Sequence, residues 1–230
     1  VWYQSNTLGM QRRIHVYTPP GYDDSVDRYP VFYLLHGGGD EDSGWGTIGR
    51  AGFILDNLLA TGKATPMLVV MPNGSLPRPQ IRRDAADIAA RFAELQNRFT
   101  NELLNDIIPF VEKSYRVKAD AENRALAGLS MGGGQTLRVL TTHPDRFAYV
   151  GIWSAGLFGG NAERWELQNE TFLAAADRVN DSVERLEIVV GDHVNKLKAG
   201  DSLHFNSGIR HMMKNIGEEK TELLVVIYGP

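Results

Sequence analysis

Hydrophobic and polar positions along this chain form short apolar runs separated by longer amphipathic stretches. Residues 13–17 alternate apolar and polar side chains, as expected for a half-exposed strand. Residues 31–35 form a continuous apolar run, which is typical of a strand buried on both faces in the middle of a sheet. The same reasoning predicts further strands at residues 67–71, 125–129, 149–153, 186–190 and 223–228.

The stretches between these runs have helical periodicity. The clearest predicted helix has its apolar side chains on one face between Phe99 and Tyr115. Further helices are predicted at residues 51–61, 131–142 and 202–216. Strands that alternate with helices are typical of an α/β fold, with a mostly parallel central sheet and helices on both of its faces.

Length and composition indicate one domain. The chain has 230 residues, of which 43% are hydrophobic, enough for one well-buried core and few for two. It contains no internal repeat, low-complexity tract or flexible linker. We therefore expect a single domain over residues 1–230. Because the chain opens on Val1 without Met and closes on an apolar run reaching Pro230, this domain is expected to be truncated at both ends.

Charge and residue content exclude several classes of function. The formal net charge is −4, from 28 acidic and 24 basic residues, and no basic block suggests nucleic acid or an anionic membrane surface as a partner. The chain has no cysteine, which excludes disulfides, cysteine-ligated zinc and thiol catalysis. No apolar run approaches the roughly 20 residues of a membrane-spanning helix. A small neutral or weakly charged substrate fits this composition best.

The strongest candidate for chemistry is the Gly-Leu-Ser-Met-Gly sequence at residues 128–132. It lies between a predicted strand and a predicted helix, the context of a nucleophile elbow, so Ser130 is the predicted nucleophile. Gly128 and Gly132 leave room for the tight turn, and the N–H of Met131 at the start of the helix is a predicted oxyanion donor. A chance G-x-S-x-G in a glycine-rich loop is the alternative, which the strand before it disfavours.

A second glycine-rich segment follows the strand predicted at residues 31–35. Residues 36–39 are His-Gly-Gly-Gly, which matches the element that supplies a second oxyanion donor, and the N–H of Gly38 is the candidate. A phosphate-binding loop is disfavoured because no Lys-Ser or Lys-Thr follows and the acidic residues 40–42 would repel phosphate. His36 itself is predicted to be structural.

With these elements placed, the chain resembles carbohydrate esterase family 1, the α/β-hydrolase family that includes feruloyl esterases and acetyl xylan esterases. The resemblance extends over nearly the whole chain and is carried by collinear motifs at residues 16–22, 34–39, 49–51, 54–56, 69–74, 128–134 and 143–147. In that family a serine attacks the ester carbonyl, a histidine relays the proton, an acid orients the histidine, and water then hydrolyses the acyl-enzyme. The resemblance implies this mechanism here, without metal or cofactor.

The resemblance also implies an acid after the strand predicted at residues 186–190, since the chain order in this fold is serine, acid, histidine. Asp192 is the only carboxylate in the loop that follows and is therefore the candidate acid. The family's Gly-x-x-Asp spacing, counted from Gly191, falls instead on Val194. A turn-stabilising role is the open alternative for Asp192.

The resemblance places the catalytic histidine directly after the strand predicted at residues 223–228, and so beyond Pro230. The histidines that do follow the nucleophile are predicted to be structural or on the surface: His143, His193, His204 and His211. Two explanations stay open. Either the natural protein continues and supplies the histidine, or the domain has lost catalysis.

Taken together, the resemblance implies a serine carboxylic-ester hydrolase that removes feruloyl or acetyl groups from plant polysaccharide. The alternative is a catalytically impaired esterase-like domain that binds carbohydrate or has a structural role. Trp45 and Trp153, near the carboxyl ends of predicted strands, are candidate substrate-binding residues, with ordinary core packing as the alternative. A secreted or periplasmic location and a place in a larger multidomain protein are further expectations from the family.

Overall fold

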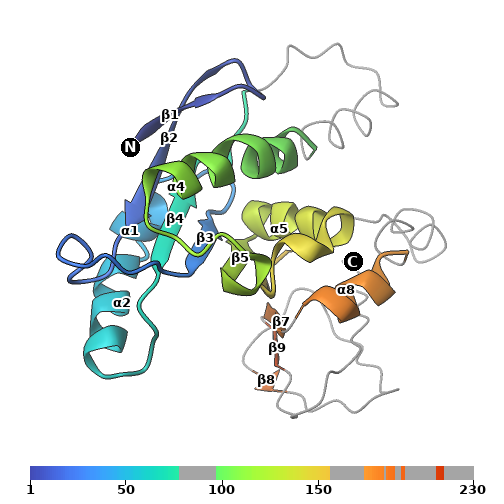
Figure 1. Ribbon diagram of the computed structural model, residues 1–230. Helices are drawn as coiled ribbons and strands as arrows, with labels where there is room; N and C mark the ends of the chain where they lie inside the picture. The colour runs from blue at the N-terminus through green and yellow to red at the C-terminus, as the bar shows by residue number, and fades with distance from the viewer. Residues whose placement is uncertain (78–96, 156–173, 184, 190–192, 195–210, 215–230) are drawn as a thin grey trace. The chain divides into compact units, whose positions relative to one another are not determined.

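The computed structural model describes residues 1–77, 97–155, 174–183, 185–189, 193–194 and 211–214 (Figure 1). It divides into two compact units, Val1–Ala119 and Asp120–Pro230. In the described part of the chain, no helix combines the length and apolar character that crossing a bilayer requires.

The first unit contains four described strands in the spatial order β1 (Trp2–Ser5), β2 (Met10–Tyr17), β4 (Leu68–Pro72) and β3 (Val31–Leu35). β2 pairs antiparallel with both β1 and β4, whereas β3 pairs parallel with β4. The strands predicted at residues 31–35 and 67–71 are confirmed, the second shifted by one residue. Because β3 and β4 are parallel and β2 runs the other way, the loops after β3 and β4 and the first residues of β2 lie at the same edge of the sheet.

The two faces of β2 carry different side chains. The strand predicted at residues 13–17 is confirmed. Burial alternates from Arg12 to His15, with Arg12 and Ile14 buried, and is intermediate at Val16 and Tyr17. Arg12 is a charged residue on the buried face, which alternation alone does not predict.

The helix predicted from Phe99 onward is confirmed but irregular. Residues 97–102 are helical, η1 (Leu103–Ile107) is a π-helix, and α4 (Ile108–Ser114) continues the run. Pro109 lies at the start of α4 and has no N–H to donate to the preceding turn, and the wider π turn accommodates it. The predicted apolar face is buried in the core: Phe99, Leu103, Leu104, Ile107, Ile108 and Val111.

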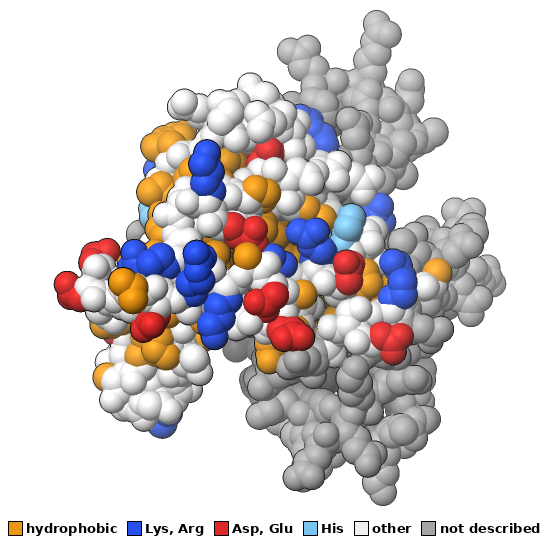
Figure 2. Space-filling model, viewed as in Figure 1, with side chains coloured by type: hydrophobic (Ala, Val, Ile, Leu, Met, Phe, Trp, Pro, Cys, Tyr) orange, Lys and Arg blue, Asp and Glu red, His pale blue; other side chains and the backbone are white. Residues whose placement is uncertain are grey.

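Two shorter helices follow β3 in the first unit. α1 (Gly44–Thr47) is a single turn, and α2 (Ala51–Ala60) confirms the helix predicted at residues 51–61, with Thr61 at its C-cap. Figure 2 shows both basic and acidic side chains among the described residues.

The second unit contains β5 (Arg124–Leu129), β6 (Tyr149–Trp153), β7 (Arg185–Val189), β9 (His211–Lys214) and β8 (His193–Val194), in that spatial order. β5, β6 and β7 are parallel, β9 is antiparallel to β7, and β8 is parallel to β9. The predicted strands at residues 125–129, 149–153 and 186–190 are thus confirmed to within one residue. The run at residues 223–228 lies outside the described residues.

Helices of the second unit pack on this sheet. α5 (Met131–Thr142) lies against β5 and β6 and confirms the predicted helix, and α8 (Ala176–Ser182) contacts α5. Two single turns, η2 (Ala121–Asn123) and η3 (Pro144–Arg146), precede β5 and follow α5. The helix predicted at residues 202–216 is wrong at His211–Lys214, because these residues form β9 and backbone pairing with β7 and β8 outweighs the local helical periodicity.

A buried polar cluster attaches β1 to the helical segment that contains Glu102. The Tyr3 hydroxyl donates to Glu102 Oε1 at 2.6 Å, and Arg12 Nε donates to the same oxygen at 3.1 Å. Glu102 is fully buried. Burial, with the hydrogen bond to Glu102 and its negative charge, raises the pKa of Tyr3, so the phenol keeps its proton and remains the donor.

Candidate active site

Ser130 lies in a strained turn between β5 and α5. Its backbone angles are φ 52° and ψ −108°, in a region that residues with a side chain rarely adopt. The turn is fixed on both sides, because the Ser130 N–H donates to the Trp153 carbonyl at 2.8 Å and the Gly134 N–H donates to the Ser130 carbonyl at 2.9 Å. The Ser130 side chain is exposed and its Oγ has no hydrogen-bond partner among the described residues. This geometry is that of a nucleophile elbow.

Glycines around Ser130 permit the close approach of β5 and α5. A Cβ atom on Gly128 would lie 2.2 Å from both the carbonyl carbon and the oxygen of Gly132. A Cβ atom on Gly133 would lie 2.7 Å from the Cβ of Ala155. A side chain at either position would therefore force the turn to shift.

Gly128→Ala is expected to lower the free energy of unfolding by about 1–3 kcal/mol, because the new methyl group meets backbone atoms that cannot rotate away. Urea unfolding followed by circular dichroism measures this loss. Gly134→Ala is the matched control: it lies in α5 with nothing within 4 Å of an added Cβ, so alanine should be neutral or stabilising there. Equal stability of the two variants would contradict the steric argument.

His36 begins the loop after β3 and uses both ring nitrogens within the fold. The Gly74 N–H donates to His36 Nε2 at 2.9 Å, and His36 Nδ1 lies 2.8 Å from the Gly37 carbonyl oxygen. Because Nε2 accepts a hydrogen bond, the proton must be on Nδ1, which donates to the Gly37 carbonyl. The buried imidazole thus joins the loop after β3 to the loop after β4.

Gly38 follows in the same loop and is exposed. Its N–H has no acceptor among the residues the structure describes, so it is available to a substrate oxygen. Gly39 has φ 85°, and the Asp40 N–H bonds the Gly37 carbonyl at 3.3 Å, which closes a tight turn around Gly38. Met131, the other predicted donor, is the first residue of α5, where a helix has N–H groups without an acceptor in a preceding turn. Gly38 belongs to the first unit and Met131 to the second, and their joint action stays a prediction.

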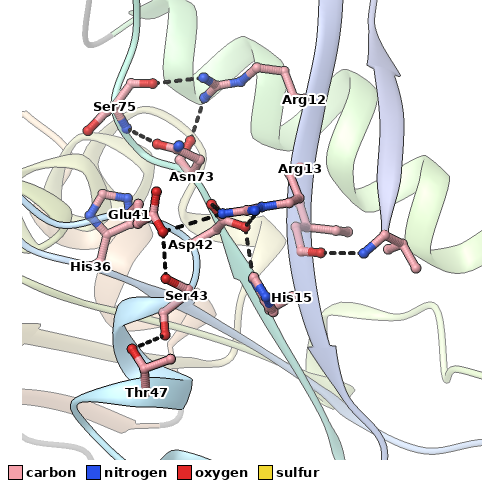
Figure 3. Close-up of polar contacts among 12 residues, drawn as sticks. Arg12, Arg13, His15, His36, Glu41, Asp42, Ser43, Thr47, Asn73 and Ser75 are labelled. Atoms are coloured by element: carbon pink, nitrogen blue, oxygen red, sulfur yellow. Dashed lines mark hydrogen bonds and ion pairs between the residues drawn. The ribbon is translucent and has the colours of Figure 1, made fainter.

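The same loop ends in a buried carboxylate, Asp42, held by two side chains of β2 (Figure 3). Arg13 binds it through both oxygens, with Nε 2.7 Å from Oδ2 and Nη2 3.1 Å from Oδ1. His15 Nδ1 lies 2.8 Å from Oδ2. The exposed fraction of the side chain is 1% for Asp42, against 38% for Arg13 and 44% for His15.

Charge around Asp42 determines its protonation. Burial by itself would raise the pKa of this carboxyl, but the hydrogen bonds and positive charges of Arg13 and His15 outweigh it and hold the pKa below its usual range. The folded-state pKa is therefore lower than the unfolded one. The stability that this group contributes is present above its unfolded pKa of about 4 and is lost as the pH falls through the folded pKa.

Arg12 organises the loop after β4 at the same edge. Its guanidinium donates to the carbonyl oxygens of Asn73 and Ser75, the latter at 2.8 Å, and the Ser75 N–H bonds Asn73 Oδ1 at 2.9 Å (Figure 3). Gly74, which donates to His36, lies between these two residues.

The predicted acid, Asp192, lies outside the described residues. Val194, at the position that the family spacing gives to the acid, is in β8 and in register with Met212 of β9. Among the later histidines, His193 is in β8, His211 is in β9, and His204 is outside the described residues.

His143, at the C-cap of α5, is half-buried, and its Nδ1 lies 2.9 Å from Thr142 Oγ1. Burial lowers its pKa. No group of three or more His, Asp or Glu side chains in the described part of the chain could hold a metal ion.

The two candidate substrate-binding tryptophans are both half-buried. Trp45 is in α1, and its ring lies 2.8 Å from the position that a Cβ on Gly49 would take. Trp153 ends β6, and its indole packs over Gly151, 3.3 Å from the corresponding position. Both keep part of their surface exposed, and a role in binding stays a prediction.

The cluster formed by Arg13, His15 and Asp42 was not predicted from the sequence, in which the acidic residues 40–42 indicated only that phosphate would be repelled. The available signal was the pair of polar side chains on one face of β2, which alternation places at the sheet surface beside the loop after β3.

The chain is similar to known proteins. Residues 5–218 match the family model described as "Putative esterase". The sequence is 37% identical over 162 residues to an endo-1,4-beta-xylanase/feruloyl esterase of Xylanibacter ruminicola, a match that covers 69% of this chain and 21% of that protein. The chain thus spans about a fifth of the length of that relative.

Solved structures of esterases have a fold similar to that of this chain. A ferulic acid esterase of Anaeromyces mucronatus in complex with ferulic acid superposes with a TM-score of 0.61 at 29% identity, over 70% of this chain and 60% of that one. The feruloyl esterase module of Clostridium thermocellum with sinapinate gives 0.66 at 24% identity, over 84% and 66%. The predicted α/β-hydrolase fold is confirmed.

Proposed function

The chain belongs to the "Putative esterase" family, and a solved structure similar to it is a ferulic acid esterase of carbohydrate esterase family 1. From this premise we propose that the chain is a serine carboxylic-ester hydrolase. Its proposed reaction is the release of feruloyl or acetyl groups from plant polysaccharide through an acyl-enzyme. A polysaccharide substrate lies outside the cell, so a secreted or periplasmic location is part of the proposal.

The conformation of Ser130 is the observation that carries this proposal. A serine with φ 52° between a strand and a helix has its Oγ exposed at the end of the sheet, where it can attack an ester carbonyl. The negative charge that develops on the carbonyl oxygen would be stabilised by the N–H groups of Met131 and Gly38. Both donors are backbone groups in fixed turns, so they need little reorganisation when the charge appears.

The proton relay needs two further groups. Asp192 is the proposed acid, and it would orient the histidine that the family has after the strand predicted at residues 223–228. Trp45 and Trp153 are the proposed aromatic contacts for the acyl group. A feruloyl group is favoured over acetyl, because the similar Xylanibacter protein is named for feruloyl esterase activity and the similar Anaeromyces structure contains ferulic acid.

A second candidate function is favoured by Val194, which has the position that family spacing gives to the acid. In this alternative the domain retains the fold and binds carbohydrate without hydrolysing its esters.

Covalent labelling separates the two functions. The natural full-length protein is incubated with a fluorophosphonate probe, and the modified peptide is identified by mass spectrometry. An esterase should be labelled at Ser130 and should hydrolyse methyl ferulate and p-nitrophenyl acetate. A protein that binds xylan oligosaccharides but is neither labelled nor active on these esters would have the second function.

A further inference from the structure

The loop at residues 36–42, which carries the proposed donor Gly38, has an anchor at each end. At its start, His36 receives a hydrogen bond from Gly74 and bonds the Gly37 carbonyl. At its end, Asp42 is bound by Arg13 and His15 of β2 (Figure 3). Both anchors connect the loop to neighbouring strands or loops of the first unit.

The residues between these anchors cannot hold themselves in one conformation. Three consecutive glycines, at residues 37–39, have no side chain to pack, and glycine has the largest conformational freedom of any residue. Among the residues between the anchors, the described bonds to loop backbone are the long one from the Asp40 N–H to the Gly37 carbonyl and one from the Glu41 N–H to Asp40 Oδ1, and neither involves Gly38. The direction of the Gly38 N–H therefore depends on the groups that fix the two ends.

The Asp42 side chain binds residues of β2 and does not cap the helix that follows it. The helix that follows, α1, has Ser43 as its N-cap, without a side-chain capping bond, so Asp42 is not the capping residue of that helix. A carboxylate buried as completely as Asp42 is costly to desolvate unless it is paired. Arg13 pairs with Asp42 through a bidentate ion pair, and His15 forms a third hydrogen bond to the carboxylate.

We propose that Asp42, held by Arg13 and His15, is a positioning residue that fixes the loop at residues 36–42 and so the direction of the Gly38 N–H. This inference rests on the proposed function, because Gly38 acts on an oxyanion only if the protein hydrolyses esters. Preorganised donors contribute to the transition state and much less to substrate binding, so loss of the anchor should change kcat more than KM.

Steady-state hydrolysis of p-nitrophenyl acetate by the natural full-length protein tests the proposal. Asp42→Asn keeps the side-chain shape but removes the charge that holds Arg13, and it is expected to lower kcat about 10- to 100-fold with little change in KM. The matched control is Asp56→Asn, which removes the charge of an exposed aspartate away from the loop. Asp56 accepts a hydrogen bond from Tyr17 of β2, and asparagine keeps an oxygen that can accept it. Its kcat should equal that of the wild type.

A double-mutant cycle tests whether Arg13 and Asp42 act as one unit. Arg13→Gln alone should lower kcat, and adding it to Asp42→Asn should lower kcat little further, because each change breaks the same contact. Additive losses in kcat would overturn the pairing. A kcat for Asp42→Asn equal to that of Asp56→Asn would overturn the positioning role.

Amide hydrogen exchange in the free protein gives a second readout that does not require activity. Exchange of the amides at residues 37–40 should become at least tenfold faster in Asp42→Asn, a larger change than that of core amides in the same variant, which report its loss of global stability. Unchanged exchange would overturn the anchor. Faster exchange in a protein that neither labels at Ser130 nor hydrolyses the two esters would confirm the anchor and reject the esterase function.

Discussion

Ser130→Ala is expected to lower kcat for methyl ferulate and p-nitrophenyl acetate by about 10⁴- to 10⁶-fold, the loss typical of serine hydrolases deprived of the nucleophile. The fold should be unaffected. Alanine has the same Cβ as serine at φ 52°, so the backbone strain does not change. The Oγ that is removed is exposed and has no partner in the described part of the chain, so the free energy of unfolding should change by no more than about 0.5 kcal/mol.

Ser154→Ala is the matched control for this measurement. Ser154 is also an exposed serine with positive φ, 49°, and it follows β6 as Ser130 follows β5. Turnover of the same order as wild type is expected for Ser154→Ala. If Ser130→Ala retained comparable turnover, the hydrolysis would come from another residue or a contaminant, and the proposed nucleophile would be rejected.

The features that the sequence predicted well are those determined by neighbouring residues. The elbow is one example: Gly128, Ser130 and Gly132 are within five positions, and the apolar run before them defines the strand from which the turn starts. β3 is another, because a continuous apolar run has only one stable location, buried on both faces. Local sequence was therefore enough to place Ser130 at the end of a strand.

The features that it did not predict depend on residues far apart in the chain. Arg13 and Asp42 are 29 positions apart, and Tyr3 and Glu102 are 99 positions apart. Nothing in the sequence near Asp42 distinguishes a buried, doubly bound carboxylate from a solvated one in an acidic loop. β9 shows the same limit, because its strand conformation comes from pairing with β7 and not from its own periodicity.

Glu102→Ala is expected to have the largest effect on stability, a loss of about 3–5 kcal/mol in the free energy of unfolding, as when one partner of a buried ion pair is removed. Glu102 is fully buried and Arg12 is only 7% exposed, so the variant leaves a guanidinium without its counter-charge. Urea unfolding with linear extrapolation measures the loss.

Tyr3→Phe and Glu122→Ala are reference variants with which the stability loss of Glu102→Ala is compared. Tyr3→Phe removes only the 2.6 Å hydrogen bond to Glu102 and should cost about 1.5–3 kcal/mol, the value of a bond to a charged group. Glu122 is exposed, and Glu122→Ala should change stability by no more than about 0.5 kcal/mol. A loss for Glu102→Ala no larger than that for Glu122→Ala would mean that the cluster does not stabilise the fold.

Arg12 links the buried Glu102 cluster to the proposed active site, so Glu102→Ala should also affect the loop after β4. Arg12 bonds the Asn73 and Ser75 carbonyls around Gly74, and Gly74 donates to His36 at the start of the loop that carries Gly38. Without Glu102 the Arg12 guanidinium loses the group that holds it, so amide exchange at residues 73–75 should accelerate along with the loss of stability. Glu102→Gln, which keeps an oxygen acceptor for Tyr3 and Arg12 but not the charge, should give an intermediate result on both measurements. If Glu102→Gln were as unstable as Glu102→Ala, the charge and not the hydrogen-bond geometry would account for the stability of the cluster.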